Sequence, residues 1–245
     1  MRIGLLECDH VSTRYLPIAG DYSEMFEAML AEADARAEVV RYDARHGVLP
    51  TGPEECDGWL LTGSRASVFD EEPWIERLAD LVRDIHEAHV PCVGICFGHQ
   101  LLAHALGGRT ERAEGGWGVG ALPMEVVAHE PWMTPELPSA TLLYSHQDQV
   151  AVLPEGGRVL GSAPHCPIAM LAIGDNVMGM QAHPEFGPVY VQALLEDRVD
   201  RIGEAATSAA LESLRQPTDE QAVARWILAF LRSRMPQDGE GRPAP

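Results

Sequence analysis

The sequence predicts an α/β fold, with a mixed, mainly parallel central sheet covered by helices on both faces. Over the first hundred residues, apolar runs such as RIGLLEC, GWLLTG and VPCVGI alternate with segments of helical periodicity. This alternation is typical of crossover units, in which a helix joins two parallel strands. Beyond residue 107 the pattern changes to strand-like segments separated by turn residues. That second pattern predicts antiparallel pairs that extend the sheet or fold over its edge.

In the first half, each expected element has a local justification. Apolar or alternating runs predict strands over 2–8, 37–44, 58–63 and 90–95, and helical periodicity predicts a helix over 22–34. A second helix is expected over 73–89, because Pro73 stands in its first turn and acidic residues precede it. Its apolar positions recur at spacings of three and four residues, at Ile75, Leu78, Val82 and Ile85.

In the second half, strands are expected over 119–128, 140–153, 157–163, 167–174 and 176–182, with a hairpin turn at Gly174-Asp175-Asn176. Helices are expected over 189–206 and 219–234, the second with an apolar stripe that packs on the core. We predict a single domain over 1–235. The last ten residues, 236–245, have too little apolar content to order themselves and are expected to form a flexible tail.

The composition argues against two classes of partner. The 245 residues carry a formal net charge of −19, so neither nucleic acid nor an anionic membrane surface is expected to attract the protein. No segment has the roughly 20 consecutive apolar residues of a membrane span. Residues 1–8 are expected to form a buried strand and not a signal peptide. Five scattered cysteines without paired spacing predict no disulfide framework and a reducing, cytoplasmic location.

Cys92, Cys96 and His99 are close enough in sequence to be considered as metal ligands. However, Cys92 lies inside the apolar run VPCVGI, and no second ligand pair with zinc-like spacing follows. We therefore interpret Cys92 as a small buried hydrophobic residue. The sequence predicts neither a metal nor a cofactor.

The strongest local signal is Cys96, which stands at the junction of a buried strand and a helix in VPCVGICFGHQLLAHALGG. Gly94 and Gly98 flank it at minus two and plus two, as a sharp strand-to-helix elbow requires. At a helix N-terminus, unpaired N–H groups and the helix dipole favour a thiolate, which is the nucleophilic form. The N–H of Phe97 would supply half of an oxyanion hole. The alternative is a buried cysteine between two packing glycines.

These residues resemble the class I glutamine amidotransferase family, whose nucleophile lies in a G-x-C-x-G-x-Q pattern that GICFGHQ matches at every fixed position. The family's second hallmark, histidine followed two residues later by glutamate, is present as His183 and Glu185. In an extended segment, residues i and i+2 face the same way, so both side chains can enter one cleft. His183 would act as the base and acid, and Glu185 would orient its ring. Alone, this segment could equally be a turn with a hydrogen-bonded histidine.

The resemblance implies further site residues and a flavodoxin-like, three-layer fold. The loop in LLTGSRASVFD resembles the family's oxyanion loop, where the N–H of Gly63 or Ser64 would be the second donor. Arg65 and Asp70 are interpreted as residues that brace this loop. Candidates for substrate binding are Gln100, Ser145, His146 and Gln147, although the segment SHQD could equally be a polar hairpin edge. His99 is the competing base, but its position on the helix flank predicts a buried, hydrogen-bonded side chain.

Three functions stay open at this stage. The first is a stand-alone glutaminase-type amidotransferase similar to the glutaminase part of GMP synthase, with a thioester intermediate. Because the chain has no ATP-binding glycine loop, a synthetase that received the ammonia would be a separate polypeptide. The second is a γ-glutamyl peptidase or hydrolase with the same triad, and the third is a catalytically idle binding or regulatory protein. Phe97 disfavours the related chaperone and intracellular-protease branch, which usually has histidine there.

Overall fold

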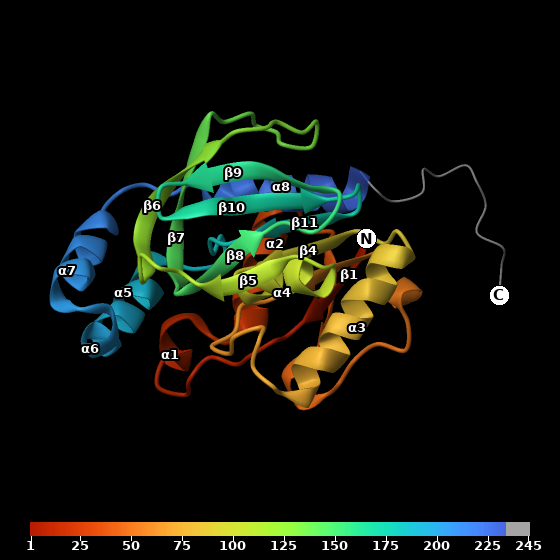
Figure 1. Ribbon diagram of the computed structural model, residues 1–245, viewed down its shortest axis with the longest axis horizontal. Helices are drawn as coiled ribbons and strands as arrows, with labels where there is room; N and C mark the ends of the chain where they lie inside the picture. Colours follow the sequence, from red (N-terminus) through yellow and green to blue (C-terminus); the bar gives the residue numbers. More distant parts are fainter. Residues whose placement is uncertain (234–245) are drawn as a thin grey trace.

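Figure 1 shows the computed structural model of the protein, which describes residues 1–233 and places a large sheet between layers of helices. The strand order of this nine-stranded sheet is β2-β1-β3-β4-β11-β10-β9-β6-β7, and β5 and β8 form a separate two-stranded sheet. The predicted α/β class with a mixed central sheet is confirmed. The strands are β1 (Arg2–Leu6), β2 (Glu38–Tyr42), β3 (Gly58–Leu61), β4 (Cys92–Ile95), β5 (Arg109–Arg112), β6 (Gly118–Val126), β7 (Ser139–His146), β8 (Asp148–Val152), β9 (Gly157–Ala163), β10 (Cys166–Ile173) and β11 (Val177–Met180).

The helices cover both faces of the parallel part of the sheet. Strands β2, β1, β3, β4 and β11 are parallel, and their buried side chains alternate between two apolar clusters. One cluster packs under α2 and α8, and the other under α3 and α4. The helices are α1 (Leu16–Ala19), α2 (Tyr22–Ala33), α3 (Pro73–Glu87), α4 (Phe97–Ala105), α5 (Pro188–Asp197), α6 (Val199–Ile202), α7 (Glu204–Ser213) and α8 (Glu220–Ser233).

The second half of the sheet is antiparallel, as the sequence predicts. Strands β10, β9, β6 and β7 extend the parallel part, and the predicted hairpin turn at Gly174 joins β10 to β11. The small sheet of β5 and β8 packs against α4, so it lies beside the helix that follows Cys96. The carboxyl ends of β3 and β4 and the corner between β7 and β8 consequently border one cavity.

Three expected elements differ from the structure. The predicted helix 73–89 ends at Glu87, because His89 has a left-handed φ of 56° and Val90 N–H donates back to the carbonyl of Ile85. The expected strand 140–153 is two strands in different sheets, so the segment SHQD is a corner and not a hairpin. The expected helix 189–206 is divided into α5, α6 and α7, since Gly203 has a φ of 94°.

The ends of the chain add two findings. The N-terminal residues form β1, a buried strand between β2 and β3 in the parallel half, as expected. The predicted tail over 236–245 lies outside the described residues, and the single domain over 1–235 stays a prediction. Within residues 1–233, no helix combines the length and the hydropathy that crossing a membrane requires.

Candidate active site

Cys96 lies on a sharp elbow between β4 and α4. Its φ of 52° and ψ of −102° are outside the regions that side-chain-bearing residues normally adopt, so tight packing must hold them. A Cβ at Gly94 would lie 2.4 Å from the carbonyl carbon of Gly98, and a Cβ at Gly98 would lie 2.7 Å from the Leu61 Cβ. The two glycines are therefore required by close approach of the backbone, as the sequence predicts.

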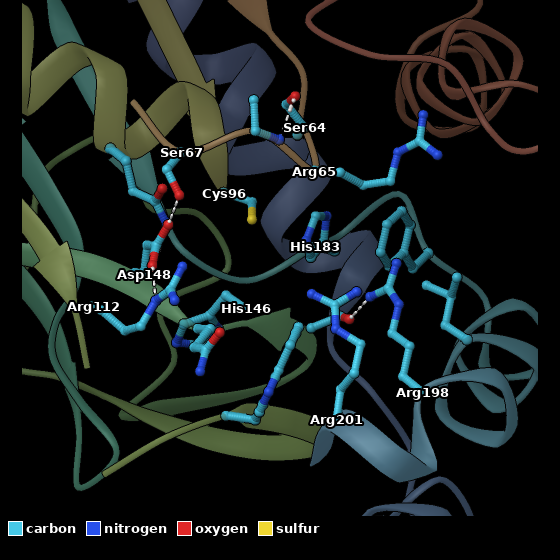
Figure 2. A pocket seen from close by; sticks show the side chains of 18 of the residues that line it. Ser64, Arg65, Ser67, Cys96, Arg112, His146, Asp148, His183, Arg198 and Arg201 are labelled. Carbon is cyan, nitrogen blue, oxygen red and sulfur yellow. Dashed lines mark hydrogen bonds and ion pairs between the residues drawn. The ribbon is translucent and has the colours of Figure 1, made fainter. Parts of the chain in front are cut away.

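His183 and Glu185 form a buried pair beside this elbow. The Nδ1 of His183 is 2.7 Å from Oε1 of Glu185, and their side chains are only 4% and 0% exposed. His183 N–H donates to the carbonyl of Leu143 at 2.8 Å, which fixes the segment after β11 against β7. Figure 2 shows the sulfur of Cys96 entering the cavity, with the His183 ring beside it. The structure thus brings the three predicted triad residues together.

The imidazole of His183 is fixed by stacking and by charge. It lies parallel to the ring of Phe186, with centroids 3.9 Å apart and planes at 5°. Burial lowers the pKa of His183, but the Glu185 carboxylate and the Cys96 sulfur outweigh burial, and the net shift is upward. A proton on this ring is consequently favoured by its neighbours. Phe186 was not predicted, and its only sequence signal is its position directly after Glu185.

Three backbone amides are candidates for an oxyanion hole. Gly63 and Ser64 line the cavity, and Phe97 follows Cys96 at the first position of α4. Within residues 1–233, none of these three N–H groups donates a hydrogen bond. A Cβ at Gly63 would lie 3.0 Å from Cε1 of His183, which explains glycine at this position. Gly63 and Ser64 therefore border the cavity that contains Cys96, and Phe97 adjoins Cys96 in the chain.

The loop that carries Gly63 is braced from two directions. Arg65 donates to Asp9 through its backbone N–H and through Nε and Nη2, at 2.8 to 2.9 Å. Burial raises the pKa of the Asp9 carboxyl, but the hydrogen bonds from Arg65 outweigh it, and the pKa is lowered overall. Asp70 accepts from the N–H of Ser67 at 2.8 Å. The geometry thus agrees with a bracing role for Arg65 and Asp70.

All four predicted substrate-binding residues line one cavity of about 150 Å³ together with Cys96 and His183. Ser145 Oγ accepts a hydrogen bond from Arg198 at 2.8 Å. Gln147 stands at the corner between β7 and β8, where its carbonyl accepts from the N–H of Ala113. Figure 2 shows this cavity with the sulfur at its centre.

Besides lining the cavity, Gln100 contacts a second buried glutamine. Its Nε2 donates to the carbonyl of Asp148 at 2.6 Å and to Oε1 of Gln181 at 3.1 Å. Gln181 in turn donates from Nε2 to the Cys96 sulfur at 3.5 Å, and it is fully buried. Gln100 therefore orients Gln181 toward the sulfur. The sequence offered one signal for Gln181, its place two residues before His183 on an extended segment.

In two other buried histidines the pKa is lowered, whereas in His183 it is raised. Burial lowers the pKa of His146, and the neighbouring imidazoles of His165, His183 and His99 lower it further. Burial also lowers the pKa of His99 to about 4, although the backbone of Gly179 and Ile168 partly opposes the shift. His99 is fully buried and does not line the cavity. Within residues 1–233 neither ring nitrogen of His99 has a hydrogen-bond partner, so the predicted hydrogen bond is not found. The burial of His99 and its place outside the cavity agree with the preference for His183 as the base.

Potential cation ligands lie away from the sulfur. Donor atoms of His10, Asp43 and His46 lie close to one another, as do those of Glu7, His10 and Asp21. His10 already contacts both Asp21 and Asp43, at 2.8 and 3.2 Å. Both groups sit at the ends of β1 and β2, outside the lining of the cavity.

Comparisons with known proteins point to one family. The profile of the family "Glutamine amidotransferase class-I" matches residues 18–200. "Gamma-glutamyl peptidase 4" of Arabidopsis thaliana is 32% identical over 193 residues, which are 75% of this chain and 73% of that protein. "GMP synthase [glutamine-hydrolyzing]" of Lactococcus lactis is 32% identical over 170 residues, which are 67% of this chain but only 32% of that longer protein.

Solved structures agree on the fold. A glutamine amido transferase from Methylobacillus flagellatus has a TM-score of 0.74 at 22% identity, covering 100% of this chain and 98% of that one. A glutamine amidotransferase from Thermotoga maritima has a TM-score of 0.73 at 22% identity, covering 96% of this chain and 97% of that one. The expected three-layer architecture is thereby confirmed.

Proposed function

The chain belongs to the class I glutamine amidotransferase family, and from that premise we propose that it hydrolyses a γ-glutamyl amide through Cys96, His183 and Glu185. The observation that carries the proposal is the buried contact of 2.7 Å between His183 and Glu185 beside the strained Cys96 elbow. A histidine held by a carboxylate next to a nucleophile has the arrangement that acyl transfer requires.

In the first step, the Cys96 sulfur attacks the γ-carbonyl carbon of the substrate, and the C=O π electrons move to oxygen. The N–H groups of Phe97 and of Gly63 or Ser64 stabilise this oxyanion. When the C–N bond breaks, His183 gives its proton to the leaving nitrogen, which departs as a neutral amine or ammonia. The γ-glutamyl group stays on sulfur as a thioester.

In the second step, a water molecule attacks the thioester carbonyl and His183 takes one of its protons. The C–S bond then breaks, glutamate leaves, and the thiolate is regenerated beside the protonated imidazole. Glu185 keeps the ring in one tautomer through both steps because its Oε1 contacts Nδ1. The other ring nitrogen is therefore the one that exchanges protons with substrate and water.

A second candidate function is the delivery of ammonia to a separate synthetase. This chain matches only about one third of a longer GMP synthase. The part of that protein outside the match would correspond to a separate synthetase here, and this favours the second candidate. The γ-glutamyl peptidase relative, matched over most of its length, favours release of the product to water. Both candidates use the same triad and differ in the leaving group.

The test is an assay of the pure protein with glutamine and with γ-glutamyl dipeptides, in which free glutamate and ammonia are measured. We expect turnover that Cys96→Ala reduces at least a thousandfold without unfolding the protein. The matched control is Cys92→Ala, a fully buried cysteine on the same strand that packs in the opposite layer and should leave the rate nearly unchanged. Inactivity on every substrate, with Cys96 inert to iodoacetamide, would favour an idle binding protein.

A further inference from the structure

Arginine is concentrated around the cavity of a strongly acidic protein. The chain has a formal net charge of −19 and 18 basic residues, of which Arg65, Arg112, Arg198 and Arg201 line this one cavity. Within the described residues, Asp148 is the one carboxylate in the lining. The lining of the cavity is therefore positively charged, although the whole protein is negatively charged. A positively charged cavity attracts anions.

Two of these arginines have carboxylate partners and two do not. Arg65 is held by Asp9, and Arg112 contacts Asp148 at 3.3 Å. Within residues 1–233, neither Arg198 nor Arg201 forms an ion pair with a carboxylate. Two guanidinium groups are thus available to an anion that enters the cavity.

Both available arginines are positioned by neutral contacts. Arg198, between α5 and α6, donates from Nη1 to Ser145 Oγ at 2.8 Å. The guanidinium of Arg201 lies over the Trp117 ring, 5.3 Å from its centroid. Such contacts orient a guanidinium without neutralising it, which leaves its charge for a ligand. Figure 2 shows the side chains of Arg198 and Arg201 extending into the same side of the cavity.

The cavity also has two distinct sides. Figure 2 shows Arg112 with Asp148 on one side of the Cys96 sulfur. Arg198 and Arg201 lie on the opposite side. A γ-glutamyl group ends in an α-carboxylate and an α-ammonium, which the paired charges of Arg112 and Asp148 complement. The unpaired arginines then face the other end of the substrate, beyond the scissile bond.

We propose that Arg198 and Arg201 bind a carboxylate on the leaving group, so that the substrate is a γ-glutamyl amino acid or peptide and not glutamine. This inference rests on the proposed function. Ammonia, the leaving group of glutamine, has no anion to occupy the two guanidinium groups. A leaving amino acid has one, and a bidentate contact with a guanidinium also fixes the direction in which the scissile amide lies.

The test compares γ-glutamylglycine with γ-glutamylmethylamide, which differ only in the carboxylate of the leaving group. We expect kcat/KM of the wild-type protein to be about tenfold higher for γ-glutamylglycine. Arg201→Gln and Arg198→Gln should each remove most of this preference, and Arg201→Gln should leave the rate on the methylamide within about twofold. The control Arg215→Gln removes the same charge from an exposed arginine outside this cavity, and should change neither rate.

Equal rates of the wild-type protein on the two substrates would overturn the inference. So would an equal loss on both substrates in Arg201→Gln, because the arginine would then serve the γ-glutamyl end or the fold. Calorimetric binding of the two compounds to Cys96→Ala separates this inference from the proposed function. About tenfold tighter binding of γ-glutamylglycine supports the arginine site even if turnover is absent, and equal binding refutes it.

Discussion

The two halves of the sheet contribute to the cavity in different ways. The parallel half presents Cys96 and Gly63 at the carboxyl ends of β4 and β3, where ligands of open α/β sheets commonly bind. The antiparallel half and the segment after it present Ser145, Arg198 between α5 and α6, and Arg201 of α6. In our proposals, backbone geometry in the first region fixes the reacting groups, whereas long side chains in the second determine which leaving group binds. The proposals therefore assign catalysis and specificity to different regions.

The largest expected effect contrasts a histidine from each region. His183→Ala should lower kcat by about a thousandfold, because it removes the group that transfers protons at both steps. His146→Gln, in the antiparallel half, should lower kcat by less than tenfold. Steady-state kinetics of the two variants checks this contrast, with thermal midpoints as evidence of folding. Equal losses in kcat would contradict the assignment of proton transfer to His183 in the first region and not to His146 in the second.

A smaller effect, on pH dependence, tests the charge beside His183. The net shift of the His183 pKa is upward, so the protonated ring persists as pH rises and is lost only when pH passes the raised pKa. Glu185→Gln removes a negative charge that raises this pKa. We expect the alkaline limb of the kcat/KM profile to move to lower pH and the maximum to fall. An alkaline limb that stays in place would mean that Glu185 does not set the protonation of His183.

The smallest effect concerns the amide that reaches the sulfur. Gln181→Met removes the donor 3.5 Å from the Cys96 sulfur in a side chain of similar size. Because one hydrogen bond contributes about 1 kcal/mol, alkylation of Cys96 by iodoacetamide at pH 7 should slow about fivefold. Leu101→Met is a matched control, since Leu101 is buried on α4 outside the cavity. An unchanged rate in Gln181→Met would show that the contact does not activate the sulfur.

The sequence could predict what depends on local backbone. Gly94 and Gly98 indicated the elbow, and the spacing of His183 and Glu185 indicated side chains on one face of an extended segment. The change from helical periodicity to short strands indicated where the parallel half ends. Each of these signals lies within a few residues of the feature that it predicts.

The features of the fold and the site that the sequence does not predict depend on contacts between distant segments. The expected strand 140–153 divides at Gln147 because its two parts pair with different partners, which periodicity within the segment does not reveal. The contact of Arg198 with Ser145 joins residues 53 positions apart. The contact of Gln100 with Gln181 joins residues 81 positions apart, while substrate binding by Gln100 stays a prediction. Pairing of this kind is fixed by the assembled fold and leaves no local pattern.

The most direct test of the central claim is mass spectrometry of the protein quenched in acid during turnover of γ-glutamylglycine. The account predicts a γ-glutamyl adduct on the peptide that contains Cys96, present in Cys92→Ala and absent from Cys96→Ala. An adduct on a different residue, or continued turnover by Cys96→Ala, would contradict it.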